Sequence, residues 1–163
     1  MFDEIDNGWT CPPLTVAMIA LAEQRLGLNI PPSYLKVLNE KNGGILQNRN
    51  IRTKQQTFYG TSDLFIFGLL GIGGDFGIDS PAEVATAPPY SHKCLGRAKL
   101  RSWNVPYNGL LFSWVGLAGF FFHYDVPYIE KEPPVYYVDV EHKSPRIMEV
   151  ATNFSEFLTM LHP

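Results

Sequence analysis

Residues 30–44 read Ile30-Pro31-Pro32-Ser33-Tyr34-Leu35-Lys36-Val37-Leu38-Asn39-Glu40-Lys41-Asn42-Gly43-Gly44. Pro32 suits the first position of a helix, because its missing N–H is not needed there and its fixed φ matches a helix start. Ile30 and Leu35 then have the spacing at which two apolar side chains pack across a helix entry as a hydrophobic staple. Asn42 and the glycines after it tolerate positive φ, as the end of a helix requires. The segment therefore predicts a short helix that begins at Pro32 and ends by Asn42.

Length and composition favour one folded domain. The chain has 163 residues, of which 45% are hydrophobic, 13% aromatic and 18% charged. This balance excludes a disordered chain and allows a sizeable aromatic core, so we expect residues 1–163 to form a single domain. The net charge of −3 argues against a surface built to bind nucleic-acid phosphates. We expect no direct nucleic-acid contact.

The two cysteines and the apolar runs carry little functional information. Cys11 and Cys94 are too few and too far apart for a metal knuckle or a disulfide framework, and we expect two buried thiols. The longest apolar run, residues 109–122, is interrupted by a serine and two glycines and is too short to span a membrane. The acidic N-terminus, residues 1–6, is unlike a secretory signal. We therefore expect a cytoplasmic location and no membrane contact.

Helical patterns occur at both ends of the chain and in the middle. A first helix is expected over residues 14–26, with Gly27 as its stop and Thr10 or Thr15 as its cap. The remaining helices are expected from Ser80-Pro81-Ala82-Glu83 to Pro88, near residues 98–103, and from Asn153 with Glu156 to Leu161.

Strand patterns fill most of the rest. They are expected at Thr57–Tyr59, Leu64–Leu70, Leu110–Val115, Gly119–Tyr124, Val135–Val140 and Arg146–Val150. Residues 116–119 form a turn suited to a hairpin. The order of elements indicates an α+β fold: a mostly antiparallel sheet of about five or six strands, with helices on one face and at both termini.

Several of these segments together resemble one family. The N-terminal part of the resemblance lies in Leu21-Ala22-Glu23, Leu26-Gly27, Ile30-Pro31, Tyr34 and Asn42-Gly43-Gly44. Its later part lies in Leu111-Phe112, Gly119-Phe120-Phe121, Asp125, Pro134-Val135-Tyr136-Tyr137, Ala151, Phe154 and Phe157-Leu158. In this order they are similar to the SMI1/KNR4 family, also called SUKH, from about Leu14 to Leu161. The motif residues to which we assign a structural role are Glu23, Pro31, Tyr34, Asn42, Gly43, Gly44, Asp125 and Phe154.

The chain departs from the family pattern in two places. The usual Leu-Pro at the helix start is Ile30-Pro31, a small change. The hairpin turn, which usually carries acidic or asparagine residues, reads Val115-Gly116-Leu117-Ala118-Gly119. Such an apolar turn is expected either to be buried or to contact a partner.

The resemblance implies a non-enzymatic protein-binding domain. Many bacterial members resemble immunity proteins, which bind and neutralise a cognate toxin protein such as a nuclease toxin domain. This is the leading hypothesis. A regulatory scaffold of the same family is the first alternative, and an uncharacterised small enzyme is the second. We expect a monomer or weak dimer without a cofactor.

Catalytic patterns are weak. The glycine-rich segment Gly71–Gly77 has Phe76 where a dinucleotide-binding loop needs glycine, and no Walker lysine follows, so a flexible loop is favoured. The four histidines are scattered without the spacing of metal ligands. Ser113 lacks the first glycine of a nucleophile elbow. We predict no catalytic residue and no metal site.

Partner contacts are expected on the less regular segments. Acidic side chains with aromatic anchors would suit a basic toxin. The candidates are Asp75, Asp79, Glu83, Trp103 and Tyr107. For Trp103, a place in the core is an equally good interpretation, since tryptophan is largely buried on average.

Overall fold

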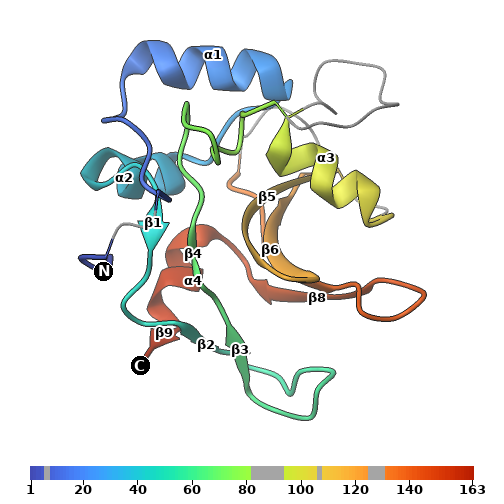
Figure 1. Ribbon diagram of the computed structural model, residues 1–163. Coiled ribbons are helices and arrows are strands. Elements are labelled where there is room, and N and C mark those ends of the chain that lie inside the picture. Colours follow the sequence, from blue (N-terminus) through green and yellow to red (C-terminus); the bar gives the residue numbers. More distant parts are fainter. Residues whose placement is uncertain (6–7, 82–93, 106–107, 125–130) are drawn as a thin grey trace.

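The computed structural model describes residues 1–5, 8–81, 94–105, 108–124 and 131–163, which form an α+β fold (Figure 1). The helices in this part of the chain are α1 (Val16–Leu26), α2 (Pro32–Glu40), α3 (Leu95–Ser102) and α4 (Phe154–Thr159). The strands are β1 (Gly44–Ile45), β2 (Asn50–Arg52), β3 (Asp63–Phe65), β4 (Gly68–Leu69), β5 (Gly109–Val115), β6 (Ala118–His123), β7 (Val135–Asp139), β8 (Arg146–Ala151) and β9 (Leu161–His162). The predicted fold class is confirmed.

The strands pair antiparallel but are spread over three sheets. The largest has the order β5-β6-β7-β8, a second has the order β3-β2-β9, and β1 pairs with β4. We expected a single sheet of five or six strands. The difference arises because β1, β4 and β9 have two residues each, too few for a strand pattern to show in the sequence.

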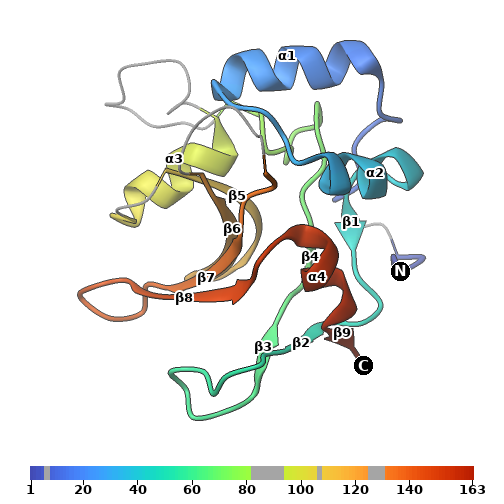
Figure 2. The same cartoon turned by 180° about the vertical axis from the view of Figure 1, so that it is seen from behind.

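Helices cover both faces of the four-stranded sheet, rather than the one face expected. Phe120 and Phe122 point into the main core with α2 and α4, whereas Phe121 between them joins a second cluster with Leu100 of α3. Successive residues of a strand face opposite sides, so three consecutive buried phenylalanines require cover on both sides. Viewed from behind, α3 lies against the β5–β6 end of the sheet and α4 lies near β9 (Figure 2).

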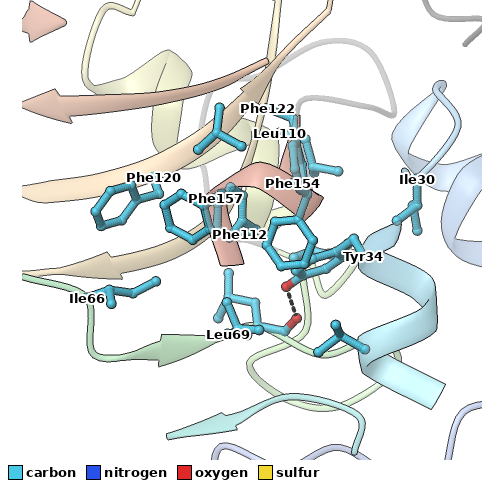
Figure 3. Close-up of a cluster of buried hydrophobic side chains, with 14 of the residues drawn as sticks. Ile30, Tyr34, Ile66, Leu69, Leu110, Phe112, Phe120, Phe122, Phe154 and Phe157 are labelled. Atoms are coloured by element: carbon cyan, nitrogen blue, oxygen red, sulfur yellow. Dashed lines mark hydrogen bonds between the residues drawn. The ribbon is translucent and has the colours of Figure 1, made fainter. Parts of the chain in front are cut away.

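The main core is an aromatic cluster around Tyr34 (Figure 3). The Tyr34 ring meets Phe154 edge-on at 4.9 Å and Phe122 at 5.4 Å between ring centroids. Its hydroxyl donates a hydrogen bond of 2.5 Å to the carbonyl of Leu70. This one residue of α2 therefore links the β4 segment, the large sheet and α4.

The ends of α1 and the start of α2 agree with prediction. Thr15 caps α1 by accepting a hydrogen bond from the Met18 amide at 3.2 Å, and Gly27 ends it in the left-handed region, at φ 70°. Helix α2 begins at Pro32, as predicted. Pro31 has no side chain that can cap it, and Glu132, 99 residues away, accepts hydrogen bonds from the Ser33 amide at 2.7 Å and hydroxyl at 2.6 Å.

The C-terminal end of α2 does not have the glycine cap that we expected. Lys41 follows the helix in an extended conformation, and positive φ angles appear only at Gly43 (85°) and Gly44 (140°). Asn42 is buried, and its amide bonds the carbonyls of Pro12 at 2.6 Å and Ile72 at 2.8 Å. The Asn-Gly-Gly segment therefore joins three parts of the chain as well as ending a helix.

The later elements were predicted with mixed success. The β5–β6 hairpin and the strands β7 and β8 are confirmed. The C-terminal helix begins as predicted, with Asn153 accepting from the Glu156 amide at 2.9 Å, but it ends at Thr159, and Leu161, expected in the helix, begins β9. The expected strand over residues 57–59 was wrong, because these residues form a turn. The expected strand over 64–70 is interrupted between β3 and β4, and α3 begins at Leu95, three residues before the predicted start. The helix expected after Ser80 lies outside the described residues.

Candidate functional site

Two of the five predicted contact residues lie in the described part of the loop between β4 and α3, residues 70–81. Asp75 is exposed. Asp79 is only 2% exposed and accepts a hydrogen bond from the Gly73 amide at 2.8 Å, with an Arg25 nitrogen at 3.7 Å. Its carboxylate holds the loop together and is not available at the surface, which corrects the expectation for Asp79.

The same loop is packed rather than free. A Cβ atom at Gly71 would lie 2.4 Å from the Asn42 carbonyl oxygen, and one at Gly74 would lie 2.6 Å from the Cys11 sulfur. The Ser80 hydroxyl donates to the Gly74 carbonyl. The glycines therefore serve close packing against neighbouring segments, and our expectation of a flexible loop was wrong.

Trp103 lies elsewhere on the surface, at the C-terminal end of α3. The loop that contains Asp75 is bonded to the first turn of α3, where the Gly96 amide donates to the Ile78 carbonyl. The length of the helix, about 12 Å, therefore separates this loop from Trp103. Glu83, Tyr107 and Asp125 lie outside the described residues. The structure thus does not gather Asp75 and Trp103 into one site.

Around Trp103 the structure assembles a surface that the sequence did not indicate. The Lys99 ammonium lies 5.5 Å from the centre of the Trp103 ring and 5.0 Å from that of Trp114 on β5. Trp114 in turn lies 6.1 Å from Trp9 of the N-terminal segment. We call Trp9, Trp114, Lys99 and Trp103 the tryptophan row. All four side chains are half-buried, so each presents an edge to solvent while packing on the next.

The hairpin between β5 and β6 follows Trp114 directly in the chain and carries exposed aliphatic side chains. Val115 is 45% exposed and Leu117 52%. Gly116 between them has φ 57° and open space around it, and the Leu117 carbonyl accepts a hydrogen bond from the Val140 amide at 2.8 Å. We call residues 115–117 the hairpin tip. Of the two expectations for this apolar turn, burial is excluded and partner contact stays a prediction.

Helix α3, which supplies Lys99 to the tryptophan row, is basic. Helix α3 has the sequence LGRAKLRS and carries two arginines and one lysine without an acidic residue. The Arg97 guanidinium is occupied by the Leu26 carbonyl at 2.9 Å and by Asn108, whereas Lys99 lies over the two tryptophan rings. Trp103 thus has basic neighbours on α3 where we expected acidic ones.

The motif residues of the resemblance have structural roles where the structure describes them. Glu23 accepts from the Ile30 amide at 2.9 Å, and the Pro31 carbonyl accepts from the Tyr34 amide at 3.0 Å. A Cβ atom at Gly43 would lie 2.6 Å from the backbone nitrogen of Gly71. These contacts join α1, α2 and the glycine-rich loop.

A polar cluster that the sequence did not indicate surrounds the buried carboxylate of Asp139. Tyr59 donates a hydrogen bond to it, Arg146 bonds it at 2.8 Å, and the Glu141 amide donates at 2.8 Å. The Arg146 guanidinium lies 4.6 Å from the centre of the Phe58 ring. Burial opposes ionisation of Asp139, but the hydrogen bonds from Tyr59, Glu141 and Arg146 outweigh it and lower the pKa. These contacts hold the turn at residues 57–59 against the end of β7.

A pocket of about 350 Å³ opens between β8 and residues 53–55. Lys54 and Glu156 form an ion pair at its wall. The hydrogen bond from Lys54, with those from Thr152, lowers the pKa of Glu156 to about 2. These two charges neutralise each other, so the pocket gives less indication of a ligand than the aromatic surface does.

Within the described residues, no three His, Cys, Asp or Glu side chains are grouped as a metal site would require, and no helix is long and apolar enough to cross a membrane. Cys11 and Cys94 are free thiols and buried, as expected.

The fold and this surface define an α+β protein that presents aromatic and aliphatic side chains around a basic helix. Comparison with known families identifies it further: the family model described as SMI1-KNR4 cell-wall matches residues 17–158. The chain belongs to the SMI1-KNR4 (SUKH) family. Neither a curated protein nor a solved structure shows significant similarity to the chain.

Proposed function

We propose that the protein is a non-enzymatic immunity protein, which binds a cognate toxin domain through the tryptophan row and the hairpin tip. Family membership supports a protein partner. The observation that carries the choice of surface is the exposed apolar hairpin tip, at a turn where the family resemblance implies polar residues. Tryptophan is among the residues most enriched at the energetic hot spots of protein interfaces, and exposed aliphatic side chains add apolar area that a partner can cover.

The chemistry of the surface also specifies the partner. Lys99 places a positive charge over the rings of Trp103 and Trp114. A complementary partner surface carries carboxylates around an apolar depression that receives Leu117. Such complementarity raises the association rate and selects among related toxins.

The test starts from the gene next to this one. The neighbouring toxin domain is expressed in a bacterial host with or without this chain, and growth is measured. Rescue of growth supports immunity. A neighbourhood of housekeeping genes without a toxin, or a toxin that this chain neither binds nor neutralises, would overturn the proposal.

The surface is tested separately with Leu117→Asp. Leu117 is half exposed, so the variant should fold normally while placing a carboxylate at the centre of the proposed contact. We expect toxin affinity, measured by calorimetry, to fall at least about tenfold, since a carboxylate buried without a partner costs more than 1.4 kcal/mol. Phe65→Asp is the matched control, because Phe65 is 47% exposed on β3 in another sheet. Unchanged affinity in Leu117→Asp would refute this surface without refuting immunity.

A further inference from the structure

The first two turns of helix α1, residues 16–22, are apolar on the side that faces solvent as well as on the side that faces the core, whereas exposed Gln24 follows on the solvent side. Ala22 and Leu26 are completely buried. On the other side Val16 is 84% exposed and Leu21 45%, and Ala17 and Ala20 are exposed between them. We call these four exposed residues the α1 face.

The spacing of these residues makes the α1 face continuous. Positions 16 and 20, and positions 17 and 21, are each four apart, so their side chains lie next to each other along one side of the helix. A helix that is apolar all round is normally buried, and an exposed apolar patch marks an interaction site. Both views show α1 at the outer edge of the molecule, with one side turned away from every sheet (Figure 1, Figure 2).

Charged groups flank one edge of the α1 face, with opposite signs at its two ends. Met18 and Arg25 are seven residues apart and share this edge. The loop between β4 and α3 runs beside it, because a Cβ atom at Gly73 would lie 2.7 Å from the Met18 methyl and Asp79 lies 3.7 Å from Arg25. Exposed Asp75 follows Gly73 at the N-terminal half of the helix, whereas Arg25 stands in the last turn with its side chain 48% exposed.

We propose that the α1 face binds a second copy of this chain, with the two α1 helices antiparallel. A two-fold axis that passes between the two helices at the level of Ala20, perpendicular to the plane that contains them, keeps the charged edges on the same side of the dimer. Arg25 of each copy then meets Asp75 of the other. Small side chains at Ala17 and Ala20 let the helices approach to the 8–10 Å of close helix packing.

The charge pattern favours a second copy over an unrelated protein as occupant. An isologous interface must be complementary to itself, so a neutral centre with opposite charges at opposite ends suits it. The antiparallel arrangement also sets the two helix dipoles in opposite directions. The dimer uses a different part of the surface from the tryptophan row, and it does not depend on the proposed immunity function.

Sedimentation equilibrium of the full chain over a range of concentrations tests the proposal. The wild type should shift reversibly from 18.4 kDa toward twice that mass as concentration rises. Ala20→Glu keeps a good helix former and brings two carboxylates together at the axis, so association should weaken at least about tenfold. Asn39→Glu is the control, because it adds the same charge at an exposed position of α2 and should dimerise normally.

Two further variants test the proposed dimer contact at other positions. Ala17→Glu should weaken association as well, and circular dichroism verifies that each variant is folded. Asp75→Lys should weaken it by about two- to tenfold, the range for exposed ion pairs, and added salt should remove this difference. A wild type that stays at 18.4 kDa at every concentration, or a dimer that persists in both folded glutamate variants, would overturn the proposal.

Discussion

The hydroxyl of Tyr34 allows a sharp test of what holds the core together. Tyr34→Phe keeps the aromatic ring between Phe122 and Phe154 and removes only the oxygen that donates to the Leu70 carbonyl at 2.5 Å. Burial raises the pKa of Tyr34, so the hydroxyl remains a donor at neutral pH. Leu70 is completely buried, and its carbonyl loses this donor in the variant.

The size of the effect follows from the burial of both groups. A buried acceptor left without its donor costs about 1–3 kcal/mol, and we expect the free energy of unfolding to fall by about 2 kcal/mol. For a chain of this length, such a change lowers the melting temperature by about 4–8 °C. Urea unfolding followed by circular dichroism measures the difference at constant m-value.

Tyr136→Phe is the matched control. The Tyr136 hydroxyl bonds Glu149 at 3.1 Å in an exposed setting, so its removal should cost less than about 0.5 kcal/mol. Equal costs for the two substitutions would refute the reasoning, because the bond to Leu70 would then contribute no more than a surface contact.

Three further predictions concern a buried carboxylate, a glycine with positive φ and a helix cap. The pKa of Asp139 is lowered in the folded state, so ionised Asp139 stabilises the fold above about pH 4, and this stabilisation is lost as the pH falls toward the folded-state pKa. Acid should therefore destabilise Asp139→Asn less than the wild type. Melting curves at several pH values measure this difference. Gly43→Ala should cost more than about 2 kcal/mol in urea unfolding, because it combines a φ of 85° with a clash against Gly71, whereas Gly8→Ala, at φ 80° in open space, should cost only about 1 kcal/mol. Asn153→Ala should lower stability by about 1 kcal/mol through loss of the α4 cap, and Asn153→Ser should restore most of it in the same assay.

The parts of the fold that were predictable depend on residues close in sequence. Thr15 and Gly27 bound α1, Pro32 begins α2 and Asn153 begins α4, each through contacts within a few residues. The β5–β6 hairpin was predictable for the same reason, since its two strands are joined by a short turn.

The candidate site was predictable only in part. Trp103 was recognised as an aromatic candidate, but its neighbours Trp9 and Trp114 come from distant segments that no local pattern links. Asp79 was placed among the contacts because an acidic side chain in an irregular segment would suit a basic toxin, whereas in the fold it is buried and bonded to the Gly73 amide. The strand predicted around Tyr59 failed because its aromatic residues pack on Arg146 rather than in a sheet.

The sequence by itself determined where most helices and the longer strands form, because capping, proline and glycine preferences and hydrophobic periodicity act over a few residues. Only the tertiary structure decided how the strands divide into three sheets and that Glu132, rather than a residue close in sequence, caps α2. It also decided that Lys99 lies over the rings of both Trp103 and Trp114. These features arise from contacts between residues far apart in the chain. Their energy depends on the final packing, which a local pattern does not encode.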